Sequence, residues 1–146
     1  MLACGQGSKP TSSDLSRSLQ SGSGDYLCSV VAVERISAVT FAVRDMAGSV
    51  VFYQKLGFHL IRGGQHSSFS SFRFGEAFVN LSTASSYEGK WWGRVIFRVN
   101  DIDAYHRSLT EAGLNPDQPT DAPWGERFFH LVDPDGHELS FAQLLL

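Results

Sequence analysis

Apolar and polar positions follow two different periods along the chain, and the two periods occur in the same order twice. Residues 35–43 (RISAVTFAV) are rich in apolar and β-branched side chains, which predicts a strand. After Asp45 the apolar residues Val50, Tyr53 and Leu56 return at helical spacing. The pattern therefore predicts a strand followed by a helix, with Asp45 as the N-terminal cap and Gly57 as the residue that ends the helix.

A second copy of this unit begins 56 residues later. The run 41–46 (FAVRDM) matches the run 97–102 (FRVNDI), and Gly57 corresponds to Gly113. In the second copy Asp101 is the predicted cap, and the predicted apolar helix face consists of Ile102, Tyr105 and Leu109. An internal repeat of this kind predicts two modules of similar structure.

Each predicted helix is followed by short runs of strand-forming residues separated by turn residues. Strands are predicted over 58–61, 66–74 and 77–82 in the first copy, and over 114–120, 126–132 and 138–144 in the second. Gly75-Glu76 predicts a hairpin, and residues 133–136 (DPDG) predict a tight turn. The order is βαβββ twice, which is typical of an α+β domain with modules at about 33–84 and 91–146.

The first 32 residues differ from the rest of the chain. They are rich in serine and glycine and lack periodic apolar positions, so we expect a disordered N-terminal extension. A transit segment and a misplaced start are the alternatives. Both cysteines, Cys4 and Cys28, lie in this segment, so the core contains no disulfide and needs no oxidising compartment. We therefore expect a cytoplasmic protein.

The charge and hydropathy of the chain exclude two classes of partner. Its 146 residues carry a formal net charge of −3, and there is no run of basic residues, which argues against binding to nucleic acid. No apolar stretch approaches the roughly 20 residues that a membrane span requires. A small molecule is the expected partner.

Several runs of the sequence resemble the vicinal oxygen chelate superfamily, which includes glyoxalases, bleomycin-resistance proteins and extradiol dioxygenases. These runs are 38–45 (AVTFAVRD), 52–58 (FYQKLGF), 123–127 (PWGER) and 133–136 (DPDG). The resemblance covers about residues 33–146. It implies paired βαβββ modules that form a cupped mixed sheet around a cleft, and it implies a homodimer.

The resemblance also implies where a divalent metal would be bound, and this chain departs from that pattern. The four ligand positions fall on Ala38, Arg94, Ser140 and, near the end of the first module, Asn80. Alanine offers no ligand atom, arginine repels a cation, and serine and asparagine are weak neutral ligands. We therefore expect no metal and no other cofactor in the usual site.

Two further residues are candidates for a displaced metal site or for acid–base chemistry. Glu138 shares a strand face with Ser140, and His130 lies on the preceding predicted strand. The other histidines are expected at the surface or in turns; they are His59, His66, His106 and His137. No nucleophile and base in a familiar motif are visible.

Two interpretations remain open for the arginines of the cleft. Arg94 and Arg98 share one strand face, and two guanidinium groups there suit a carboxylate or a phosphate. Alternatively, Arg94 pairs with Glu138 and fills the space that the metal would occupy. Trp92 and Trp124, with Trp91, either offer flat surfaces at the rim of the cleft or seal a module or dimer interface.

The sequence therefore predicts a metal-free protein that binds a small organic, and in one interpretation anionic, molecule in its cleft. The alternative is an enzyme of the superfamily (a lyase, isomerase, thiol transferase or dioxygenase) that is metal-free or has a displaced metal. The expected ligand-binding residues are Asn80, Trp92, Arg94, Arg98, Trp124, Glu138 and Ser140.

Overall fold

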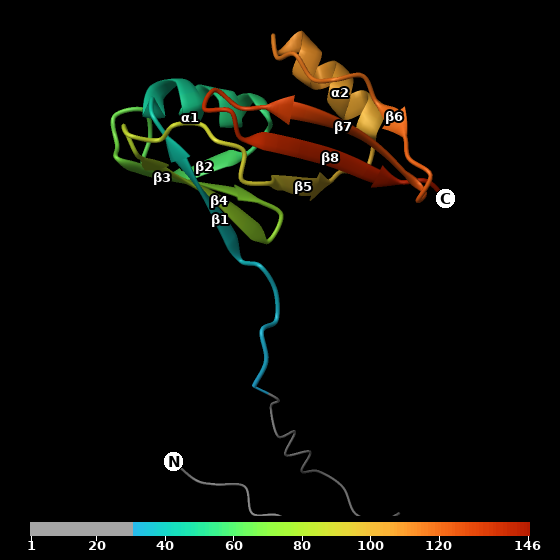
Figure 1. Ribbon diagram of the computed structural model, residues 1–146, viewed down its shortest axis with the longest axis horizontal. Helices are drawn as coiled ribbons and strands as arrows, with labels where there is room; N and C mark the ends of the chain where they lie inside the picture. The colour runs from blue at the N-terminus through green and yellow to red at the C-terminus, as the bar shows by residue number, and fades with distance from the viewer. Residues whose placement is uncertain (1–30) are drawn as a thin grey trace, which may run out of the picture. The chain divides into compact units, whose positions relative to one another are not determined.

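Two four-stranded sheets, each accompanied by one helix, form the compact unit over residues 35–146 in this computed structural model (Figure 1). The structure describes residues 31–146, so the expectation of a disordered extension falls almost entirely outside the described residues. The elements are β1 (Ala38–Val43), α1 (Met46–Lys55), β2 (His59–Arg62), β3 (Phe69–Phe74), β4 (Ala77–Thr83), β5 (Arg94–Arg98), α2 (Ile102–Glu111), β6 (Thr120–Asp121), β7 (Glu126–Val132) and β8 (Glu138–Leu144).

The two sheets have the same topology. The strand order is β1-β4-β3-β2 in the first and β5-β8-β7-β6 in the second. In each sheet the first strand pairs with the last in parallel, and the remaining pairs are antiparallel. The two helices have ten residues each and begin 56 residues apart. These observations confirm the predicted α+β fold of paired βαβββ modules.

The helix boundaries follow from the capping residues that the sequence indicated. The side chain of Asp45 accepts a hydrogen bond from the backbone nitrogen of Ala47 at 3.1 Å, and Asp101 accepts one from Ala104 at 3.0 Å. Gly57 and Gly113 follow the helices with φ angles of +86° and +85°. A residue with a β carbon is strained at such angles, so glycine suits both positions.

The strand predicted over 114–120 is wrong. Only Thr120–Asp121 pairs with β7, while the preceding segment has no regular structure. Pro116 and Pro119 lack the backbone N–H that a sheet ladder requires, which explains the difference. A hydrogen bond of 2.9 Å from Asp117 N to His130 O connects this segment to β7.

Phe97 joins the hydrophobic cores of the two modules. Its ring centroid lies 5.3 Å from that of Phe58 and 5.1 Å from that of Phe74, both in the first module. On its other side it stacks on Phe141 of β8 at 5.3 Å. All of these rings are buried or partly buried, so one continuous core runs through both modules.

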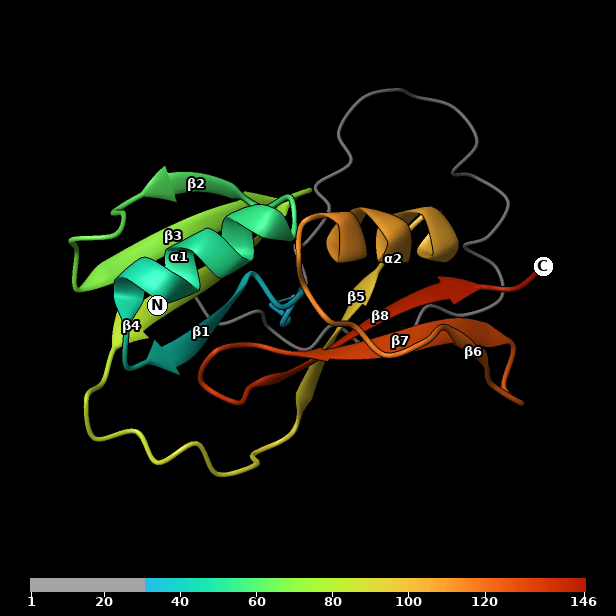
Figure 2. The same ribbon diagram turned by 90° about the horizontal axis from the view of Figure 1, so that it is seen from above.

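A polar contact between the modules is made by the turn between β7 and β8, which lies beside β1 in Figure 2 and forms hydrogen bonds with α1. Asp133 and Asp135 are 4% and 3% exposed. Asp133 Oδ2 accepts from Tyr53 Oη at 2.9 Å, and Asp135 Oδ2 accepts from Ser49 Oγ at 3.2 Å. Arg44 Nε donates to Asp135 Oδ1 at 3.0 Å. We call this group of five residues the inter-module clamp.

His137 lies beside the clamp and not at the surface, which corrects the expectation from the sequence. It is 2% exposed, and its Nε2 donates to Ala42 O at 2.7 Å. Its Nδ1 accepts from the indole nitrogen of Trp92 at 2.8 Å. Both ring nitrogens therefore have partners, and these partners hold the segment between β4 and β5 against β1.

No helix in residues 31–146 is long and apolar enough to cross a membrane.

Candidate functional site

The candidate site lies on the second sheet, on the face turned away from α2, which we call the open face. Alternate residues of β5 and β8 point to this face, and the register places Arg94 opposite Glu138 and Ile96 opposite Ser140. His130 of β7 is opposite Ser140 on the other side. A pocket of about 140 Å³ on this face is lined by Arg94, Ile96, Trp124, Glu126, Phe128, His130, Ser140 and Ala142.

An ion pair lies at one end of this pocket. Arg94 Nη2 is 2.7 Å from Glu138 Oε1, and the two side chains are 40% and 21% exposed. The other oxygen of Glu138 accepts from Trp91 Nε1 at 3.1 Å. The geometry corresponds to the second interpretation of Arg94, in which Glu138 neutralises the guanidinium group. An arginine paired in this way has less charge to offer an anionic ligand.

A histidine and a serine form a short contact beside the ion pair. His130 Nδ1 is 2.6 Å from Ser140 Oγ, and His130 Nε2 is 3.3 Å from Arg94 Nη1. Because a guanidinium group can only donate, Nε2 must be the acceptor, and the proton of the neutral ring is on Nδ1. His130 then donates to Ser140 and cannot take its proton. Together with the 3% exposure of Ser140, this argues against a nucleophilic serine.

The other end of the pocket is apolar and open. Trp124 is 68% exposed and stacks on Phe128, with ring centroids 5.9 Å apart and an interplanar angle of 21°. Its indole nitrogen donates to Glu126 Oε2 at 2.9 Å. Ile96 is 65% exposed on the neighbouring strand. The site therefore combines a flat aromatic surface with a neutralised pair of charges.

Four lining residues were not among the site residues expected from the sequence: Ile96, Glu126, Phe128 and Ala142. Counting back from His130 in steps of two along β7 gives Phe128 and Glu126 on the same face. The alternation along β7 is therefore the sequence signal that indicates Phe128 and Glu126.

Four of the expected ligand-binding residues are not among those that line this pocket. Glu138 lies at its edge, where it pairs with Arg94. Asn80 is on the first sheet, where its Nδ2 donates to Thr40 Oγ1 at 3.4 Å. Trp92 contacts His137 at the junction of the modules. Arg98 is 61% exposed, and its Nη2 is 4.0 Å from Glu126 Oε1. The structure thus brings together Arg94, Trp124, His130, Glu138 and Ser140.

The side chains at the four family ligand positions do not suit a divalent metal. Arg94 forms an ion pair, Ser140 bonds to His130, and Asn80 bonds to Thr40. Within residues 31–146 no three side chains of histidine, cysteine, aspartate or glutamate converge on one point. A metal site requires several deprotonated ligands at about 2.0–2.2 Å, and these residues do not offer such a set.

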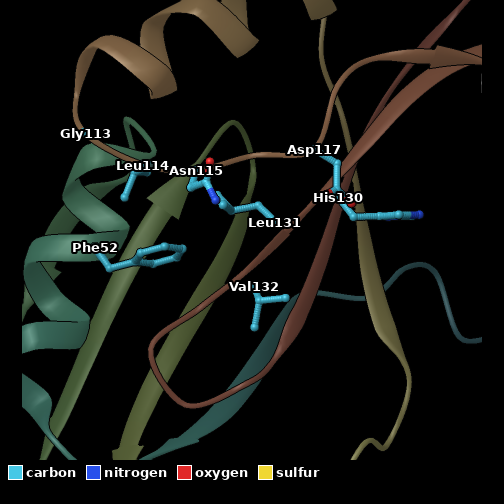
Figure 3. Close-up of a pocket in the computed structure, with 8 residues that line it drawn as sticks. All are labelled: Phe52, Gly113, Leu114, Asn115, Asp117, His130, Leu131 and Val132. Atoms are coloured by element: carbon cyan, nitrogen blue, oxygen red, sulfur yellow. The ribbon is translucent and has the colours of Figure 1, made fainter.

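A larger crevice lies between α1, β7 and the segment after α2 (Figure 3). It has a volume of about 420 Å³, and its lining is mostly apolar, with Phe52, Leu114 and Leu131 on its walls. Asn115 and Asp117 are its polar side chains, since the side chain of His130 points away from it. The charged pair and the exposed aromatic rings therefore belong to the open face and not to this crevice.

Comparisons with known proteins agree with the architecture. Residues 35–141 match the model of the Glyoxalase/Bleomycin resistance protein/Dioxygenase superfamily. A search of curated proteins finds no match. A bleomycin-binding protein solved in complex with bleomycin has a TM-score of 0.65 and 20% identity, covering 76% of this chain and 98% of its own.

Two other solved structures are similar. A bleomycin resistance determinant encoded on the transposon Tn5 has a TM-score of 0.67 and 20% identity, covering 77% of this chain and 100% of its own. A fosfomycin resistance protein from Listeria monocytogenes has a TM-score of 0.66 and 17% identity, covering 79% and 97%. The paired modules and their shared topology define a vicinal oxygen chelate fold. The chain belongs to the Glyoxalase/Bleomycin resistance protein/Dioxygenase superfamily.

Proposed function

We propose that the protein binds a planar organic molecule on the open face of the second sheet, without a metal. The observation that carries this proposal is the exposed stack of Trp124 on Phe128 next to Ile96. Large apolar side chains exposed together on a sheet face are typical of a binding surface. A bleomycin-binding relative with the same fold gives this proposal a precedent.

A metal-free enzyme that uses Glu138 or His130 as acid or base has less support. Glu138 is already paired with Arg94 and Trp91, and His130 is held between Arg94 and Ser140. A general base needs a free acceptor near the proton that it removes. Binding without turnover therefore explains the arrangement better.

Replacing Phe128 by alanine is expected to weaken the binding of planar heteroaromatic compounds by roughly tenfold, because the stacking surface is lost. Ligand-observed NMR with a set of such compounds measures the effect. Val51→Ala is the matched control, since Val51 is 39% exposed and lies on α1, away from the open face. Equal binding by the Phe128 and Val51 variants, or no binding by the native protein, would contradict the proposal.

We also propose that the protein is a homodimer in which the open face of the first sheet meets that of the partner's second sheet. Both helices lie on the same side of their sheets in Figure 1, so the open faces of the two sheets lie on the same side of the chain. A second copy would form the opposite wall of a ligand cleft over Ile96 and Trp124, which are 65% and 68% exposed. Light scattering after size exclusion is expected to give twice the 16.1 kDa chain mass. A monomer at micromolar concentration would contradict this arrangement.

A further inference from the structure

The open face of the first sheet, turned away from α1, carries two arginines without an acidic partner. Arg62 is directly opposite Ser71 and Arg73 is directly opposite His59 in the β2–β3 pairing. Ser71 is in turn opposite Asn80 of β4. Directly opposite residues project from the same face of a sheet. Both arginines are exposed, and neither forms an ion pair with another residue of the described chain.

The surrounding sequence leaves this positive charge uncompensated. Residues 46–75 contain Lys55, Arg62 and Arg73 and no aspartate or glutamate. The next acidic residue, Glu76, is paired with Arg35 at 3.0 Å. The arginines of the second sheet differ, because each of them lies within 4.0 Å of a carboxylate oxygen. An anion is therefore attracted more strongly to the first sheet.

Two short polar side chains beside Arg62 supply further donors on this face. Ser71 is 8% exposed, and its Oγ has no hydrogen bond to a residue within 31–146. Its neighbours in the same cross-strand row are Arg62 on β2 and Asn80 on β4, and the row ends at Thr40 on β1. The Ser71 hydroxyl is not an enclosed group without a partner, and a serine hydroxyl can donate to an anion on this face.

We propose that Arg62, Arg73, Ser71 and Asn80 bind the phosphate group of a small organic molecule. Neighbouring strands are about 4.8 Å apart, so the long Arg62 side chain and the short Ser71 and Asn80 can donate to different oxygens of one tetrahedral anion. The planar guanidinium groups supply paired donors and charge. This inference deepens the proposed function. It rests on that function only in assigning the phosphate group and the planar group to one ligand.

The test is a titration of the full chain with inorganic phosphate and with phenyl phosphate, followed by NMR of the backbone amides and arginine side chains. Arg62→Gln and Arg73→Gln are each expected to weaken binding of both probes by roughly tenfold. Arg107→Gln is the matched control, because Arg107 is exposed on α2 and its removal changes the net charge equally. Absence of phosphate binding, or equal weakening in all three variants, would overturn the inference.

Ser71→Ala separates a ligand contact from a structural role. It is expected to weaken phosphate binding about threefold or more without lowering the unfolding midpoint in urea, because the hydroxyl forms no hydrogen bond with another residue in 31–146. A lower midpoint with unchanged phosphate binding would count against the proposal. If phosphate binds as expected but phenyl phosphate binds no more tightly, the anion site stands and the proposed aromatic site fails. If Phe128→Ala weakens heteroaromatic binding while neither arginine variant affects phosphate binding, the proposed aromatic site stands and the anion site fails.

Discussion

Replacing Asp133 by alanine is expected to lower the free energy of unfolding by about 3–5 kcal/mol. The carboxylate accepts from Tyr53 Oη at 2.9 Å and from the backbone nitrogens of Asp135 and His137 at 2.9 and 2.8 Å. Removing it leaves three donors buried without partners. Urea unfolding measures the loss. The matched control is Asp121→Ala, since the Asp121 side chain is 62% exposed and its loss is expected to cost about 1 kcal/mol or less.

A comparison of the native protein with the Asp133→Asn variant measures how this site makes stability depend on pH, and the sign follows from the pKa of Asp133. Burial raises the pKa of Asp133 above its ordinary value of 3.8, and the hydrogen bonds from His137, Tyr53 and Asp135 offset this only in part. The folded protein therefore holds this proton to a higher pH than the unfolded chain does. The protonated group therefore adds to the free energy of unfolding. This contribution is complete below pH 3.8 and is lost as the pH rises through the higher pKa of the folded state.

The stability of the native protein relative to the asparagine variant is thus expected to fall as the pH rises through this window. Urea unfolding of both proteins at a series of pH values from 3.5 to neutrality measures it. A difference that grows with pH would mean that the pKa of Asp133 is lowered in the folded state and would contradict the assignment. Burial, followed by the neighbouring charge of Asp133, also raises the pKa of Tyr53 well above its ordinary value, so Tyr53 remains a donor throughout.

Replacing Phe97 by alanine is expected to cost about 3–5 kcal/mol, because the ring fills the space between the two modules. Phe97 is 5% exposed and contacts aromatic rings of both modules. Thermal and urea unfolding measure the loss. Phe69→Ala is the control, since Phe69 is 40% exposed and its removal is expected to change stability by about 1 kcal/mol or less.

A double-mutant cycle then tests whether this ring couples the modules. Phe58 and Phe97 lie 5.3 Å apart with their rings at 63°, so the two alanine substitutions are expected to interact by about 0.5–3 kcal/mol. Strictly additive losses would show that the two modules are stabilised independently and that the contact at Phe97 does not connect them.

The fold was predictable because its signals are local. The caps at Asp45 and Asp101, the stops at Gly57 and Gly113, and the 56-residue repeat each act within a few residues or by simple comparison. The error over 114–120 arose because the apolar start of that segment outweighed its two prolines, although a proline cannot donate to a neighbouring strand.

The candidate site was predictable only in part, because side-chain pairing depends on contacts between distant residues. Alternation placed Arg94 and Glu138 on the same faces of their strands, but the choice between a free and a paired Arg94 required the parallel register of β5 and β8. The burial of His137 had no local signal, since it follows from the contact of the linker residue Trp92 with it. Residues 133–136 (DPDG) predict a turn, but the hydrogen bonds of Asp133 and Asp135 in the clamp depend on side chains of α1 that are distant in the sequence.

The inter-module clamp has a consequence for biosynthesis. The hydrogen-bond acceptors of Tyr53 and Ser49 in α1 lie 80 and 86 residues further along the chain. During synthesis the first module is therefore made before the carboxylates that satisfy these hydroxyl groups. A gene that ended after the first repeat would encode a half that is complete in sequence pattern and incomplete in hydrogen bonding. The two modules repeat in sequence, but each depends on the other for its hydrogen bonds.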